Sequence, residues 1–201
     1  AVKTKSPHVM LSGAGAEEFA KEQGLEMVED NMYFATPKTM EWIEKLKQES
    51  KKNGTVGCVV LDKQGNLTAG TSTGGMFKKR WGRIGDSPVI GAGTYADNNS
   101  CAVSCTGHGE YFIRHAVAFD VCARYKYLKE SVEKAADYII HTELNTNAGN
   151  GGLIAVDKLG NIAMPYNSGG MFRGFLYKEK GRPEIKKGCG IGKKIVVVGE
   201  K

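Results

Sequence analysis

Apolar and polar residues alternate in two different ways along the chain, and the change falls at Gly54. Before it, residues 17–24 are predicted to form a short helix. Thr36-Pro37 is typical of a helix start, with threonine as the N-cap and proline in the first turn. Apolar residues at helical spacing follow through residues 40–46, and a charged stretch ends at residues 53–54. The front of the chain is therefore predicted to be helical.

Beyond this point the pattern changes to short apolar strands separated by glycine-rich turns. Residues 56–73, VGCVVLDKQGNLTAGTST, are predicted to form two strands joined around residues 62–66, where Asp, Gly and Asn favour a hairpin turn. Residues 151–168, GGLIAVDKLGNIAMPYNS, have the same layout and align with the first segment without a gap, Asp157 matching Asp62. The chain thus contains one hairpin design twice.

This repeat separates what a hairpin needs from what it does not need. The alignment places three residues of the first copy over three of the second: Gly54 over Gly149, Thr55 over Asn150 and Gly57 over Gly152. Backbone geometry is expected to account for the glycines in both copies. It does not require a threonine at position 55.

Two more helices are predicted between the hairpins. Residues 105–110 lead into a strongly helical stretch at residues 111–126, and a second helix is predicted at residues 131–143. Helices between two hairpins, with another helix before them, indicate sheets covered by helices, an α+β layered domain. The IVVV run at residues 195–198 is predicted to be a late strand, and residues 182–194 have no assignment.

Composition narrows the class of protein. A chain of 201 residues is long enough for one well-buried domain, and no apolar run reaches the roughly 20 residues that span a bilayer. The net charge of +6 is spread among acidic residues, which favours a solvated surface over a nucleic-acid face. The four histidines are scattered, so no metal site is predicted.

The cysteines and the first residues bear on the compartment. Five cysteines without a CxxC pair are typical of buried thiols in a reducing compartment. The chain starts at Ala1 with no signal-peptide pattern and no opening strand, so we expect that a preceding segment is missing and that the N-terminus does not identify the compartment. The thiols favour the cytoplasm, with the periplasm as the alternative.

Gly54-Thr55 is the first candidate site. If the peptide bond before Thr55 were cut, this residue would carry both a hydroxyl and a free α-amine, with an amine pKa of about 8. The amine can act as general base for the hydroxyl of the same residue. Glycine on the leaving side suits self-cleavage because it leaves room for the attack. The alternative is an ordinary loop-to-strand junction.

Two loops are further candidates. Thr73 ends the predicted hairpin that Thr55 begins, so the two hydroxyls could meet; the alternative is a simple turn at residues 72–75. In the loop at residues 82–88, Arg83 and Asp86 could clamp the carboxylate and the ammonium of an amino-acid-like ligand. The alternative there is a surface salt bridge, which contributes little.

The fourth candidate lies at residues 106–109, ahead of a predicted helix. A hydroxyl and backbone N–H groups in this place could face developing negative charge, as an oxyanion hole requires. The alternative is a glycine-rich helix entry, and the lone His108 is more often structural than catalytic in such a context.

Taken in order, these motifs resemble one family. GTVG at residues 54–57, STGG at 72–75, GRIGDSP at 82–88 and TGHGE at 106–110 closely resemble the plant-type L-asparaginase and isoaspartyl aminopeptidase family of N-terminal nucleophile hydrolases. GGLI at residues 151–154 and SPHVM at residues 6–10 fit it too, and the resemblance runs through residues 6–175.

The resemblance implies an αββα four-layer sandwich, with the N-terminal part of the family fold not present in this chain. Residues 1–54 would be the C-terminal part of an α subunit and residues 55–201 the β subunit, together one domain. The missing segment would be a partner and could hold a structural sodium ion. A dimer of αβ heterodimers is expected, with no nucleic acid or membrane partner and no cofactor for catalysis.

It also implies roles for individual residues. Thr55 would be the nucleophile, exposed by autoproteolysis after Gly54, and would form an acyl-enzyme with L-asparagine or a β-aspartyl dipeptide. The remaining roles are hydrogen bonding to the nucleophile by Thr73, substrate binding by Arg83, Asp86, Gly107 and Gly109, and an oxyanion hole at Thr106 and the Gly107 N–H. Glycosylasparaginase, which GGLI disfavours, and a non-catalytic amino-acid-binding module are the alternatives.

Overall fold

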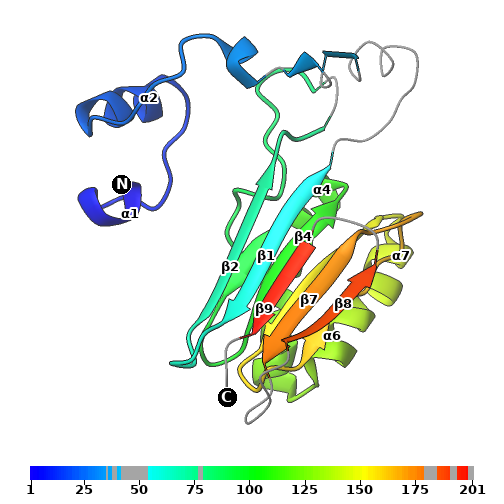
Figure 1. The fold of residues 1–201 in the computed structure, drawn as a ribbon. Helices are drawn as coiled ribbons and strands as arrows, with labels where there is room; N and C mark the ends of the chain where they lie inside the picture. The colour runs from blue at the N-terminus through cyan, green and yellow to red at the C-terminus, as the bar shows by residue number, and fades with distance from the viewer. Residues whose placement is uncertain are drawn as a thin grey trace. The chain divides into compact units, whose positions relative to one another are not determined.

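The computed structural model describes residues 1–34, 36–37, 40–41, 54–76, 79–178, 185–190 and 194–198 (Figure 1). It contains two compact units, Ala1–Lys51 and Lys52–Lys201. The described elements of the first unit are α1 Val2–Lys5, α2 Gly13–Glu22 and the 3-10 helix η1 Asn31–Phe34. The helix predicted at residues 17–24 is confirmed as part of α2, which begins earlier, and the helix predicted from Thr36 onward falls largely outside the described residues.

The second unit holds two sheets and the helices that cover one of them. Its strands are β1 Thr55–Leu61, β2 Leu67–Thr73, β3 Thr94–Ala96, β4 Cys101–Gly107, β5 Gly151–Asp157, β6 Ile162–Ala163, β7 Arg173–Lys178, β8 Ile185–Gly190 and β9 Lys194–Val198. One sheet has the order β2-β1-β9-β7-β8 and the other the order β3-β4-β5-β6. The predicted late strand is confirmed as β9, which lies parallel to both β1 and β7.

Both predicted hairpins are present. In the first hairpin, β1 and β2 pair antiparallel from Thr55 opposite Thr73 to Leu61 opposite Leu67. In the second, β5 and β6 pair over only two residues. Pro165 follows soon after β6, and a proline cannot donate a ladder hydrogen bond, which is a physical reason for the shorter pairing.

The two turns are built alike around an aspartate. The Asn66 backbone N–H donates to Asp62 Oδ1 at 2.7 Å and its side-chain amide donates to Asp62 Oδ2 at 2.8 Å. In the second turn the corresponding bonds from Asn161 to Asp157 measure 2.9 and 2.8 Å. The glycines at positions 65 and 160 have φ of 85° and 87°, a conformation that glycine adopts without steric cost. The repeat therefore preserves the turn chemistry in detail.

The helices between the hairpins are α4 Gly109–Arg114, α5 Val117–Ala123, the π-helix η2 Arg124–Leu128, α6 Val132–Tyr138, the π-helix η3 Ile139–Glu143 and α7 Leu144–Thr146. The single helix predicted at residues 111–126 is wrong in one respect: it breaks at Ala116, whose φ of 44° is left-handed. The second predicted helix is confirmed, and Ser131 caps it by accepting the Lys134 N–H at 3.2 Å.

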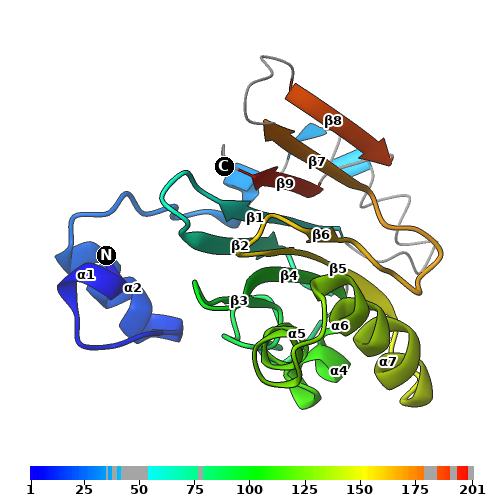
Figure 2. The ribbon, with the colours of Figure 1, turned by 90° about the horizontal axis from the view of Figure 1, so that it is seen from below.

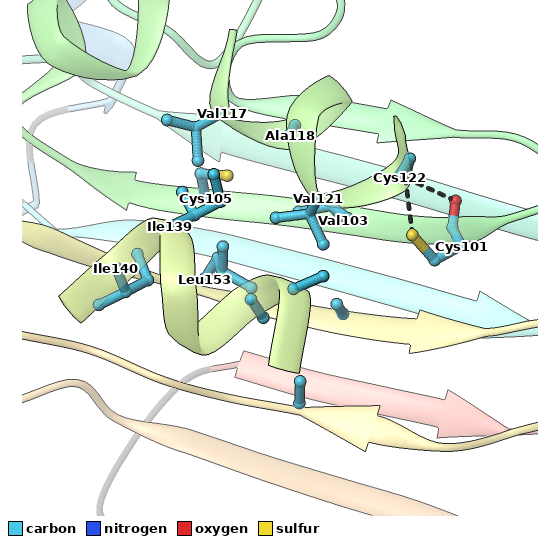
Figure 3. Packing of buried hydrophobic residues seen from close by; sticks show 14 of the residues in the cluster. Cys101, Val103, Cys105, Val117, Ala118, Val121, Cys122, Ile139, Ile140 and Leu153 are labelled. Atoms are coloured by element: carbon cyan, nitrogen blue, oxygen red, sulfur yellow. Dashed lines mark hydrogen bonds between the residues drawn. The ribbon is translucent and has the colours of Figure 1, made fainter. Parts of the chain in front are cut away.

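Two apolar layers hold these elements together. Figure 2 shows the two sheets stacked on each other, with the helices on the outer side of the sheet that contains β4 and β5. One lies between the sheets, with Val59 of β1 and Leu67 of β2 packed near Ala102 of β4 and Ile154 of β5. The other lies between the second sheet and the helices, where side chains of α5 and η3 pack on residues of β4 and β5 (Figure 3). The described part of the second unit is thus an α+β arrangement in three layers: the helices, the sheet that contains β4 and β5, and the sheet that contains β1 and β2.

Four cysteines, Cys58, Cys101, Cys105 and Cys122, carry free thiols. Cys101, Cys105 and Cys122 are buried in the helix-side core, as predicted, and Cys58 is half-buried. The Cys101 and Cys122 sulfurs lie 2.8 Å apart, within hydrogen-bond reach (Figure 3). The hydrogen bond with Cys101, and then burial, raise the pKa of the Cys122 thiol well above its usual range, so it stays protonated.

Candidate functional site

Two threonine hydroxyls meet at the open end of the first hairpin, opposite its turn. Thr55 is the first residue of β1 and Thr73 the last residue of β2, and the ladder places them directly opposite each other. The Thr55 hydroxyl lies 3.3 Å from Thr73 Oγ1 and donates to it. This confirms the predicted meeting of the two side chains, because a hairpin of equal arms brings its outermost residues together.

Thr73 is the centre of a small hydrogen-bond group. It accepts the Gly75 backbone N–H at 3.0 Å, and its own hydroxyl points to the Gly54 carbonyl oxygen at 3.5 Å. A hydroxyl can donate once and accept twice, so all three contacts can exist together. Thr73 therefore lies between the hydroxyl of Thr55 and the carbonyl on the other side of the Gly54–Thr55 bond.

The packing around Gly54 differs from that around its counterpart in the repeat. A Cβ added at Gly149 would lie 3.1 Å from Leu144 Cδ2 and 3.2 Å from Tyr111 Cβ. A Cβ added at Gly54 would have no atom of the described residues within 4 Å, and the Gly54 backbone is not left-handed. Packing accounts for glycine at position 149 and does not account for it at position 54.

Thr106, on β4 of the second sheet, lies toward the same end of the two stacked sheets as Thr55. Ser104 lies on the face of β4 that contacts β1, where a Cβ added at Gly57 would collide with its hydroxyl. Thr106 is two residues beyond Ser104, and Thr55 is two residues before Gly57. Thr106 therefore lies about 6.6 Å along β4 from Ser104, and Thr55 lies about 6.6 Å along β1 from Gly57. Figure 1 shows β1 beginning at the end where β4 leads into α4.

Glycines at the end of β4 allow an unusually close strand pair. Gly107 is opposite Gly151 of β5, and each has a positive φ, 152° and 159°. A Cβ at either position would overlap the backbone of the other strand, so neither position can carry a side chain. This close pairing fixes the backbone of residues 106–108, where the oxyanion hole is predicted.

Arg83 and Asp86 lie together beside Gly109, as the clamp prediction requires. A Cβ at Gly109 would lie 2.8 Å from Asp86 Oδ1 and 3.0 Å from Arg83 Nη2. Asp86 is buried, only 7% exposed. The pKa of Arg83 is raised chiefly by its hydrogen bonds to Glu110, and the negative charge of Asp86 adds to this. The absence of a side chain at Gly109 leaves space next to both charged groups.

Glu110 belongs to this group although the sequence did not indicate it. Its carboxylate oxygens receive Arg83 Nε and Nη2, each at 2.8 Å, in a two-pronged ion pair. The Arg83 hydrogen bonds are the largest cause that lowers the pKa of Glu110, to about 2, so this carboxylate stays ionised. Its place directly after Gly109 in the TGHGE motif was the available signal.

His108 caps the start of α4 and contacts the ion pair from the side. Its Nε2 lies 3.4 Å from Glu110 Oε2, and its ring meets the Tyr111 ring edge-on at 5.1 Å between centroids. Its backbone N–H donates to the Asn150 carbonyl at 3.0 Å. These contacts are those of a structural residue, in line with the sequence interpretation.

The site residues thus form two groups. The first group consists of Gly54, Thr55 and Thr73. The second group consists of Arg83, Asp86, Gly109 and Glu110. Residues 106–109 run from the end of β4 to the second group. Among the residues that the structure describes, no cluster of three or more His, Cys, Asp or Glu side chains could hold a metal ion. None of the described helices is long and apolar enough to cross a membrane.

Comparison with known proteins gives consistent matches. The profile of the asparaginase family (Asparaginase_2) matches residues 1–184. The chain is 46% identical over 190 residues to the isoaspartyl peptidase of Salmonella typhimurium. The aligned region covers 88% of this chain and 60% of that protein. For the isoaspartyl peptidase of Escherichia coli the identity is 42% over 203 residues, covering 90% of this chain and 63% of that protein.

A mammalian relative matches as well. The isoaspartyl peptidase/L-asparaginase of Mus musculus is 43% identical over 182 residues, 85% of this chain and 54% of that protein. The chain therefore spans 60% and 63% of the length of the two bacterial relatives.

Proposed function

Because the chain belongs to the asparaginase family, we propose that it is an autoproteolytically activated hydrolase of the L-asparagine side-chain amide and of β-aspartyl (isoaspartyl) dipeptides. The names of the relatives, isoaspartyl peptidase and isoaspartyl peptidase/L-asparaginase, support this substrate class. The observation that carries the proposal is the group formed by the Thr55 hydroxyl, the Thr73 hydroxyl and the Gly54 carbonyl.

This group suits cleavage of the Gly54–Thr55 bond. Thr55 Oγ1 attacks the Gly54 carbonyl carbon and passes its proton to Thr73 Oγ1, while Thr73 gives its own proton to the Gly54 oxygen. When the C–N bond breaks, that proton moves to the nitrogen, which becomes the free amine of Thr55. Water then hydrolyses the ester that joins Gly54 to Thr55 Oγ1. The open space around Gly54 supports this step because no contact with the described residues requires glycine there.

The free Thr55 then acts on the substrate. Its amine takes the hydroxyl proton as Thr55 Oγ1 attacks the side-chain carbonyl of an aspartyl unit, and passes the proton to the departing ammonia or amino acid. An aspartyl ester on Thr55 remains. Water, deprotonated by the same amine, hydrolyses it and releases aspartate.

The clamp orients the substrate. We assign the α-carboxylate to Arg83 and the α-ammonium to Asp86, with the backbone of Gly107 and Gly109 assisting. Glu110 already occupies the Nε–Nη2 edge of Arg83, so the ligand carboxylate meets the Nη1–Nη2 edge. The glycines at 85 and 109 support this orientation, because a Cβ there would lie 2.8 Å from Nη1 and 3.0 Å from Nη2.

An oxyanion hole at Thr106 completes the site. The Thr106 hydroxyl and the Gly107 N–H would receive the negative charge that develops on the substrate carbonyl oxygen. The close pairing of Gly107 with Gly151 supports this role, since it holds the backbone in one conformation before the substrate arrives.

The wider architecture follows the same family expectation. On the outer face of β1, Val56 is 48% exposed and Cys58 and Val60 are half-buried, so the strand is apolar on both sides. Such strands are typical of sheets covered on both faces, which supports an αββα four-layer sandwich. The unit boundary after Lys51 supports an α subunit ending at Gly54 and a β subunit from Thr55.

A segment preceding Ala1 is proposed to complete the α subunit and to carry a structural sodium ion, and two αβ heterodimers are proposed to assemble. No cofactor takes part in the proposed chemistry, since Thr55 supplies both the nucleophile and the base.

Mass spectrometry of the purified protein tests the function. We expect two fragments separated after Gly54 in the wild type, an intact chain in Thr55→Ala, and aspartate release from L-asparagine and β-Asp-Leu by the cleaved form. Turnover of GlcNAc-Asn in preference to β-Asp-Leu would instead identify a glycosylasparaginase. An uncut wild type that releases no aspartate would refute the proposal.

A further inference from the structure

A layer of hydroxyl groups lies between the two sheets, one step below the proposed catalytic threonines. Thr71 Oγ1 of β2 is 2.7 Å from Ser104 Oγ of β4, and Thr94 of β3 donates its hydroxyl to Thr71. Ser104 is fully buried, and Thr71 and Thr94 are half-buried. We call Thr71, Thr94 and Ser104 the hydroxyl layer.

Strands β2 and β4 each carry one member of this layer and one proposed site residue on the same face. Thr71 is two residues from Thr73, and Ser104 is two residues from Thr106. Gly57 of β1, two residues from Thr55, packs against the Ser104 hydroxyl. Because strand side chains repeat with a period of two, the layer lies directly beneath the site residues. The inter-sheet space is apolar further down, around Val59.

The hydroxyl layer also reaches the clamp loop. Thr94 Oγ1 lies 3.2 Å from the Ser87 carbonyl oxygen, and Thr71 Oγ1 lies 3.3 Å from the Gly93 carbonyl oxygen. The Gly93 N–H in turn donates to the Asp86 carbonyl at 3.1 Å. The loop that carries Asp86 is therefore bonded to the strand that carries Thr73.

Stability alone is a poor reason for such a layer. A buried hydroxyl must be hydrogen-bonded to avoid a desolvation cost, and an apolar residue at the same place would avoid that cost altogether. Hydrogen bonds differ from apolar contacts in that they fix direction and distance. Glycine at position 57 lets β1 approach the Ser104 hydroxyl closely, since any side chain there would push the sheets apart.

We propose that Thr71, Thr94 and Ser104 are positioning residues, which hold the nucleophile hairpin, the oxyanion strand and the clamp loop in one fixed register. This inference rests on the proposed function for its kinetic consequence. Displacement of a reacting group by about 1 Å can cost a factor of about 100 in rate. Loss of the layer therefore lowers kcat and the rate of self-cleavage more than it changes KM.

Thr71→Val tests the proposal because it removes the hydroxyl and keeps the shape. We expect kcat to fall by about 10- to 100-fold with KM within about 2-fold. Thr71→Ser, which restores the hydroxyl, should recover most of the activity. Thr68→Val is the matched control, since Thr68 lies on the exposed outer face of the same strand, and should leave kcat unchanged. Ser104→Ala should act in the same direction as Thr71→Val.

A second measurement separates this inference from the proposed function. Crystal structures of the wild type and of Thr71→Val give the distance between Thr55 Oγ1 and Thr73 Oγ1, which is 3.3 Å here. A changed distance or register supports positioning even if the protein turns over no substrate. An unchanged distance, wild-type kcat in Thr71→Val, or a Thr71→Ser variant as impaired as Thr71→Val would each overturn it.

Discussion

The two hairpins of the second unit share their turn and differ at their open ends. At the turn, Asp62 and Asp157 bind an asparagine four residues on through the same pair of bonds. At the open end, the first hairpin presents Thr55 and Thr73, whose hydroxyls are joined by a single long bond of 3.3 Å. Thr73 is exposed and Thr55 half-buried.

The open end of the second hairpin is filled by one side chain. Asn167 accepts the Gly151 N–H at 2.8 Å through Oδ1, and its amide nitrogen lies 3.1 Å from the carbonyl oxygens of both Ile140 and Gly149. It also reaches Asn145 Oδ1 at 2.6 Å. These bonds tie the hairpin to the helix that precedes it and leave its polar groups satisfied.

One backbone design can thus end in two ways. In the second copy the polar groups at the open end hold the hairpin to its neighbours, and in the first copy we propose that they serve chemistry. The glycines follow the same division. Gly152 is required by contacts with Tyr166 and Met171, and Gly57 by the Ser104 hydroxyl. Neither has a left-handed backbone, so the expectation that backbone conformation explains them is wrong, and close packing is the reason.

Thr55→Asn gives the first hairpin the residue of the second and should have the largest effect. Without the hydroxyl neither self-cleavage nor acyl transfer can occur, so we expect an intact chain and a loss of activity of about 10⁴-fold or more. Thermal unfolding should be nearly unchanged because Thr55 makes one long side-chain bond. Retained cleavage after Gly54 in this variant, seen by mass spectrometry, would show that Thr55 is not the nucleophile.

Thr73→Val removes the hydroxyl that lies between Thr55 and Gly54. We expect self-cleavage and kcat to slow by about 100-fold, the size of effect seen when one polarising group is lost. Ser168→Ala is the control, since Ser168 occupies the matching place in the second copy and its hydroxyl donates to the nearby Gly170 carbonyl at 3.2 Å. Equal rate losses in the two variants would mean that the open ends do not differ in function.

Asn167→Ala, at the open end of the second hairpin, should lower the stability of the protein, whereas the variants of the first hairpin lower its activity. It leaves the Gly151 N–H and two carbonyls without their partner, so we expect the free energy of unfolding to fall by about 2–3 kcal/mol in urea denaturation. A loss below about 0.5 kcal/mol would contradict the structural role that its four bonds indicate.

Much of the first hairpin and its site could be predicted from local sequence. Turn chemistry fixes the register, and the register alone brings Thr55 to Thr73. The proximity of Arg83 and Asp86 was predictable because the two residues lie in one short loop. Features that depend on packing between distant segments were not. Examples are the hydroxyl layer, and the insertion of β9 beside β1.

Two errors of prediction have the same origin. The break at Ala116 carries no glycine or proline signal, and the neighbouring Val117 and Ala118 are fully buried against the sheet, so tertiary packing decides the helix path. The pairing of Glu110 with Arg83 depends on where the chain turns after Gly109, which residue spacing alone does not give.

Gly54→Ala and Gly149→Ala compare the same position in the two copies. A methyl group at Gly149 meets Leu144 and Tyr111 at 3.1–3.2 Å, so overpacking should reduce stability by about 1–2 kcal/mol. At Gly54 we expect no change in unfolding but slower self-cleavage, because the methyl crowds the carbonyl that Thr55 attacks. Denaturation midpoints and the fraction of cleaved chain over time measure the two effects. Similar destabilisation of both variants would remove the distinction between them.

The smallest expected effect is the pH dependence of the stability that the Glu110–Arg83 ion pair contributes. This pair lies near the open end of the second hairpin, where the His108 N–H donates to the Asn150 carbonyl. The pKa of Glu110 is lowered from 4.5 to about 2 by the Arg83 hydrogen bonds. A group whose pKa is depressed by folding stabilises the protein above its unfolded pKa and loses that contribution as the pH falls through the folded one. This contribution should therefore be complete above pH 4.5 and disappear toward pH 2.

Glu110→Gln keeps one hydrogen-bond acceptor and removes the charge. We expect the difference in unfolding free energy between wild type and variant to be constant near neutral pH and to shrink as the pH falls below 4.5. The partial exposure of both side chains keeps the difference small. Glu133→Gln, on the helix α6, controls for the loss of one carboxylate charge elsewhere on the surface. A difference that stays constant down to pH 2 would show that the Arg83 pair does not depress the pKa of Glu110.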